Sequence, residues 1–83
     1  MINHPSRRLA ALYRAWVAAD KVWVAEIEAA YPKEWPGDVR YITKGKGEPG
    51  TPLRTAYDTC HALQQAFYDA GGRDWLMGRK VDA

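Results

Sequence analysis

The residues whose types and spacing could do chemistry lie in the middle of the chain, where Gly45-Lys46-Gly47-Glu48-Pro49-Gly50 spells G-x-G-x-x-G. In dinucleotide-binding proteins, such a loop joins a strand to a helix whose N-terminus holds the pyrophosphate. That fingerprint also needs a second strand with an acidic residue about 20 positions on. The matching position here lies near Asp69, in a predicted helix, and no second strand follows. The Walker A pattern fails too, because no Lys-Ser/Thr follows Gly50. We interpret the segment as a glycine-rich linker.

Candidate nucleophiles and metal ligands are few. Cys60 and His61 are adjacent, so on a helix they point about 100° apart and cannot form a nucleophile–base pair with each other. Cys60 is the single cysteine, which excludes a disulfide within the chain. A structural zinc site needs about four ligands at short spacings, and only Cys60, His61 and a distant His4 are offered. We therefore expect no enzyme activity, no metal and no cofactor.

Length and composition favour a small binding protein. The 83 residues are enough for one domain, residues 1–83, with a thin core. The net charge of +2 is too balanced to indicate nucleic acid by itself. A lone cysteine and no secretory signal predict a cytoplasmic protein, and no run approaches the roughly 20 apolar residues of a membrane span. Four Trp and five Tyr are many for this length, and such residues dominate binding hot spots.

Two stretches with apolar residues at three- and four-residue steps predict an all-α protein. The first helix should span about 6–31 and the second about 52–70. Thr51 is a suitable N-cap for the second helix, and Pro52 fits its first position. Gly71 is a natural left-handed stop. Since each helix has one apolar stripe, we expect an antiparallel helical hairpin.

The connector from 33 to 50 is long for a helical hairpin, where about 2–8 residues is usual. Trp35-Pro36-Gly37-Asp38 predicts a turn, and the β-prone residues 39–43 predict one short extended segment. The remainder predicts a flexible, basic loop. After the second helix, 73–77 predicts a short C-terminal helical turn that buries Trp75 against the hairpin.

The first helix carries more aromatic surface than one neighbouring helix can cover. Trp35 and Trp75 could cover part of it, and any surplus would face a partner or a second copy in a homodimer. Interface hot spots favour Trp, Tyr and Arg. The candidate partner-binding residues are Trp16, Asp20, Trp23, Trp35, Arg40 and Tyr41.

Asp20 interrupts the apolar arc of the first helix, and Gln64 interrupts that of the second. A buried polar group must find a hydrogen-bond partner. Asp20 therefore either pairs across the hairpin, with Gln64, His61 or Arg54, or faces a binding partner.

The sequence thus predicts a stoichiometric protein-binding module, either an adaptor or an inhibitor. Short, cofactor-free phage and mobile-element proteins that block host machinery, such as anti-CRISPR proteins, have this general size and type, although no motif is shared. The alternative is nucleic-acid binding through the basic loop and the N-terminal arginines. Its candidate residues are Arg7, Arg8, Arg14, Lys44, Lys46 and Arg54.

Overall fold

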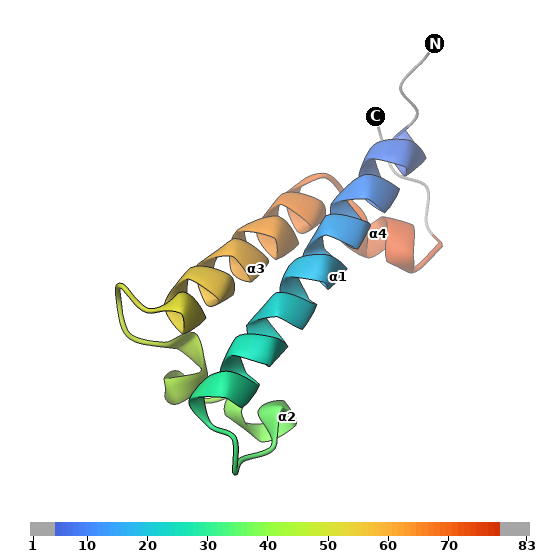
Figure 1. Cartoon of the computed structure of the whole chain (residues 1–83). Helices are drawn as coiled ribbons and strands as arrows, with labels where there is room; N and C mark the ends of the chain where they lie inside the picture. Colours follow the sequence, from blue (N-terminus) through green and yellow to red (C-terminus); the bar gives the residue numbers. More distant parts are fainter. Residues whose placement is uncertain (1–4, 79–83) are drawn as a thin grey trace.

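The computed structural model describes residues 5–78 and is all-α over that range, as predicted. Its elements are α1 (Pro5–Ala30), α2 (Pro36–Val39), the 3-10 turn η1 (Thr43–Lys46), α3 (Pro52–Asp69) and α4 (Gly72–Leu76). Figure 1 shows α3 running back beside α1, with α2 and η1 at one end of the pair and α4 at the other. Within these residues, no helix has both the length and the apolar character that a membrane span requires.

Local signals set the ends of the long helices. The hydroxyl oxygen of Thr51 accepts a hydrogen bond from the backbone N–H of Arg54 at 3.2 Å and so caps α3, with Pro52 at the first helical position. Gly71 follows α3 with φ +95°, the left-handed conformation predicted for the stop. Helix α1 begins at Pro5, one residue earlier than predicted, because a proline ring suits a first turn whose N–H groups have no intrahelical partner.

The main core lies between α1, α3 and α2. Its buried side chains are Ala19, Trp23, Ile27, Val39, Leu53, Ala56 and Cys60. All but Val39 belong to the predicted apolar stripes of the two long helices. The Cα trace measures only 46 × 23 × 16 Å, so the helices form a single layer and both faces of the α1–α3 pair lie close to solvent.

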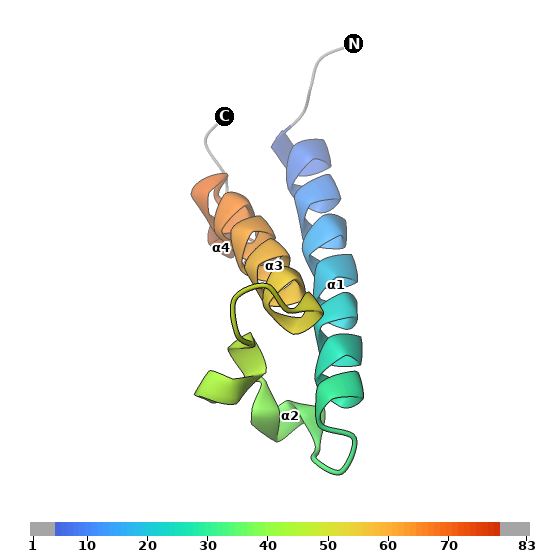
Figure 2. The same ribbon diagram turned by 60° about the vertical axis from the view of Figure 1, so that its left-hand side comes forward.

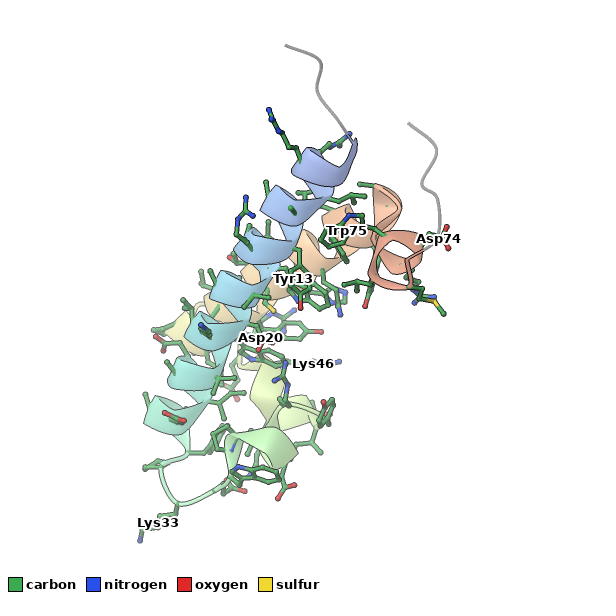
Figure 3. The ribbon with its side chains drawn as sticks, turned by 90° about the vertical axis from the view of Figure 1, so that its right-hand side faces the viewer. Tyr13, Asp20, Lys33, Lys46, Asp74 and Trp75 are labelled. Atoms are coloured by element: carbon green, nitrogen blue, oxygen red, sulfur yellow. The ribbon has the colours of Figure 1, made fainter. Side chains whose placement is uncertain are left out.

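A second cluster of aromatic side chains closes the α4 end. Phe67 is fully buried, and its ring centroid lies 5.6 Å from that of Tyr13 and 5.7 Å from that of Trp16. Trp75 of α4 packs edge-on against Phe67 at 6.0 Å and beside Tyr13 (Figure 3). The predicted C-terminal turn is therefore present, and it half-buries Trp75 against the long helices.

Two predictions for the connector are wrong. The β-prone residues 39–43 do not form an extended segment: Val39 ends α2, and backbone turn bonds such as Ile42 N–H to Val39 C=O, at 3.2 Å, lead into η1. The first part of the expected flexible loop is also ordered, because Gly45 lies buried in η1. Burial of Val39 in the core outweighs its β propensity, because the whole propensity scale spans only about 1 kcal/mol and depends on context. Figure 2 shows the connector folded beside the C-terminal end of α1 and below the start of α3.

Candidate functional site

A cavity of about 360 Å³ opens where α1, α3 and the connector meet; we call it the central cavity. Its lining residues are Trp16, Asp20, Trp23, Arg40, Tyr41, Tyr57, Cys60, His61 and Gln64. Five of the six candidate partner-binding residues are in this set, and Trp35 is the exception. The other face of the helix pair carries a larger open groove of about 510 Å³, lined chiefly by small side chains of α1 and α3 such as Ala19, Ala56 and Thr59.

Trp23 fastens the connector to α1. Its indole N–H donates a buried hydrogen bond of 2.8 Å to the backbone carbonyl of Gly45, and the residue is only 7% exposed. Gly45 must lack a side chain, because a Cβ there would lie 2.2 Å from the carbonyl oxygen of Val39. The connector backbone can therefore fold back on itself between Val39 and Gly45 only because position 45 is glycine, and this folded connector presents the Gly45 carbonyl to Trp23.

An ion pair adds a second attachment. The Arg40 guanidinium pairs with the Asp20 carboxylate and also donates from Nη1 to Oδ2 at 3.5 Å, with both side chains half-buried. The guanidinium carbon lies 5.0 Å from the centroid of the Trp23 ring and 5.7 Å from that of Tyr41, so it makes cation–π contacts as well. The connector thus supplies the partner of Asp20, and none of the three pairings considered across the hairpin is observed. Figure 3 shows Asp20 on the side of α1 that faces the connector.

The α3 wall of the cavity is aromatic and polar. The Tyr57 ring meets that of Trp23 edge-on, with the centroids 5.4 Å apart, and the His61 ring stacks on that of Tyr57 with the centroids 5.7 Å apart. Tyr57 is not among the candidate binding residues predicted from the sequence, because its place in the apolar stripe of the second helix predicts a core residue. Gln64 is half-buried, and its amide makes no hydrogen bond within the described part of the chain.

Cys60 lies at the floor of the cavity, with its sulfur 3.9 Å from Asp20 Oδ1. Burial raises the pKa of this thiol above its ordinary value of 9.0, and the neighbouring Asp20 charge raises it further. A thiol that stays protonated is a poor nucleophile and a poor metal ligand. Among residues 5–78 no three His, Cys, Asp or Glu side chains are grouped to hold a metal, and His4 lies outside that range.

The basic residues considered for nucleic-acid binding fall into two separate groups. Lys44 pairs with Glu34, and Arg54 pairs with Asp58 at 3.1 Å. Lys46, labelled in Figure 3, extends over the ring of Tyr57, with Nζ 5.9 Å from the ring centroid, and so lies beside the central cavity that Tyr57 lines. The other group, Arg7, Arg8 and Arg14, is exposed on the N-terminal half of α1, away from the connector (Figure 1). The six side chains therefore do not form one surface.

Trp35 and Tyr41 stand at the outer side of the connector. Trp35 is 71% exposed and lies over Gly37 instead of covering α1. Of the two tryptophans expected to cover aromatic surface of α1, only Trp75 does so. Tyr41 is 83% exposed at the rim of the central cavity.

Comparison of this chain with protein-family models, with curated proteins and with solved structures finds no match in any of the three. The inference of function therefore rests on the chemistry of the cavity and of the connector beside it.

Proposed function

We propose that this protein binds another protein stoichiometrically, as an adaptor or inhibitor, through the central cavity and the aromatic side chains of the connector. One observation carries the proposal: Trp35 and Tyr41 are 71% and 83% exposed on a connector that is anchored to α1. Trp and Tyr supply much of the binding energy at protein interfaces. Because Trp23 and Asp20 already hold the connector in place, little further ordering is needed when a partner binds.

The same site argues for binding over catalysis. The one thiol in the cavity is buried and has a raised pKa, so it is not an activated nucleophile. The aromatic rings and the Asp20–Arg40 pair are well suited to contact but supply no general base aimed at a nucleophile. A reducing, cytoplasmic setting suits the free thiol of Cys60. A protein that blocks host machinery by covering one of its surfaces would need such contact groups and no catalytic group.

The test is capture of a partner from cells that produce the protein, with chemical crosslinking and mass measurement of the complex. The double variant Trp35→Ala, Tyr41→Ala should lose most of the captured partner while keeping the helical circular dichroism of the wild type. Met77→Ala is the matched control, since Met77 is also exposed, at 66%, but lies after α4 at the other end. Equal capture by the double variant and the wild type would refute the proposal.

The same experiment separates the alternatives. Binding of nucleic acid through several phosphate contacts should weaken steeply as salt rises, whereas an aromatic protein interface should respond little. The paired states of Lys44 and Arg54 make the nucleic-acid alternative the weaker one. A crosslinked species with twice the mass of the chain would indicate that the partner is a second copy.

A further inference from the structure

The size and walls of the central cavity suit one ring-sized group. Its volume of about 360 Å³ lies near the lower end of the range of about 300–1,000 Å³ for ligand cavities. Aromatic residues from all three surrounding segments line it: Trp16 of α1, Tyr41 of the connector and Tyr57 of α3. An aromatic side chain entering between them would find offset or edge-on ring contacts, worth about 0.5–1.5 kcal/mol per pair beyond the buried area.

The cavity also offers polar groups whose hydrogen-bonding capacity is not used up. The Gln64 amide makes no hydrogen bond within the described part of the chain. The Arg40 guanidinium has five N–H donors, of which one on Nη1 and one on Nη2 bond the Asp20 carboxylate. Both groups can donate to an oxygen atom of an incoming ligand.

Of the basic side chains beside the cavity in the described part of the chain, one is not balanced by a carboxylate. Arg40 is balanced by Asp20, and Arg54 by Asp58. Lys46 lies over the Tyr57 ring with no carboxylate of residues 5–78 within ion-pair distance. The unpaired positive charge of Lys46, next to the half-buried ring of Tyr57, attracts an anionic group and disfavours a cationic one.

From these three features we infer that the central cavity receives an aromatic side chain of the partner together with a carboxylate adjacent to it. The ring lies among Trp16, Tyr41 and Tyr57, and the carboxylate lies between Lys46 and the free donors of Arg40. This inference rests on the proposed function and names the chemistry of the partner segment: an aromatic residue next to Asp or Glu.

Three small probes test the inference on the intact chain without the partner. Phenylacetate carries both a ring and a carboxylate, phenethylamine carries the ring with the opposite charge, and cyclohexylacetate carries the carboxylate without an aromatic ring. In amide and indole NMR titrations, phenylacetate should shift the signals of Trp23, Tyr57 and Gln64 in a saturable way. The other two probes should bind at least about fivefold more weakly, because each lacks one of the two attractions.

A pair of neighbouring substitutions provides the control. Gln64→Glu places a negative charge inside the cavity and should weaken phenylacetate at least about fivefold, since like charges a few ångströms apart repel strongly in a half-buried site. Gln65→Glu makes the same change on the exposed side of α3, where Gln65 bonds Asp69, and should leave phenylacetate affinity unchanged.

Three outcomes would overturn the inference: no saturable shifts with phenylacetate, equal binding of phenethylamine, or equal effects of the two Glu variants. Its failure is distinguishable from failure of the proposed function, which is measured by partner capture. If capture depends on Trp35 and Tyr41 while the probes fail, the protein binds its partner by another chemistry. If partner capture does not depend on Trp35 and Tyr41 and the probes also fail to bind as expected, both proposals are wrong.

Discussion

Replacing Trp23 by Phe should destabilise the protein more than a Trp-to-Phe replacement elsewhere in the chain. The reason is that it removes the donor of the buried hydrogen bond to the Gly45 carbonyl, which is 2.8 Å long. A buried carbonyl left without its donor costs about 1–3 kcal/mol. The smaller ring also leaves a void beside Ile27 and Tyr57, which adds about 1 kcal/mol. The expected loss is therefore about 2–4 kcal/mol, out of a total unfolding free energy of about 5–15 kcal/mol.

Urea denaturation followed by circular dichroism measures this loss, and thermal unfolding should show a Tm lower by about 8–30 °C. The control within the same chain is Trp35→Phe, since Trp35 is 71% exposed and its change should stay within about 0.5 kcal/mol. If the two variants were equally stable, the hydrogen bond of the Trp23 indole would not be what holds the connector on α1.

Two further predictions concern the polar groups of the cavity. The half-buried Asp20–Arg40 pair should show a coupling free energy of about 1–2 kcal/mol, between the values for exposed and for buried ion pairs. Urea denaturation of a double-mutant cycle of Asp20→Asn and Arg40→Met measures this coupling, and a value near zero would refute the anchoring role of the pair. Burial, and then the Asp20 charge, raise the pKa of Cys60, so the native state holds this proton more tightly than the unfolded chain does. Its contribution to stability is complete below pH 9.0 and is lost as the pH rises through the raised pKa, so the urea midpoint of the wild type should fall above pH 9.0 more steeply than that of Cys60→Ala. Parallel curves for the two proteins would contradict this assignment.

The long helices could be predicted because their signals are local. Thr51 and Pro52 act within one turn of the helix they begin, and Gly71 adopts its left-handed φ at the residue itself. The three- and four-residue spacing of the apolar residues also predicts inward-facing positions, and Ile27 in α1 and Phe67 in α3, which follow that spacing, are fully buried. Helix class, helix ends and the inward faces follow from residue type and spacing over a few positions.

The connector could not be predicted in the same way. Val39 is β-prone by type, yet it ends α2 because its side chain enters the core between the long helices. Gly45 looked like part of a mobile linker, and its buried place depends on the close approach of Val39 and on the Trp23 indole. These constraints come from residues that are 6 and 22 positions away, and no local pattern contains them.

The sequence by itself determined that this is an all-α protein with two long amphipathic helices, the second capped by Thr51, and an excess of aromatic residues. It also placed Trp16, Asp20, Trp23, Arg40 and Tyr41 among the candidates for a binding site, from residue type and, for Asp20, from its place in the apolar arc of the first helix. Only the tertiary structure decided that these five line one cavity while Trp35 stays outside it. The physical reason is that the buried and exposed faces of a helix are set by residues three or four positions apart, whereas the contact of Arg40 with Asp20 depends on the path of the whole connector across α1.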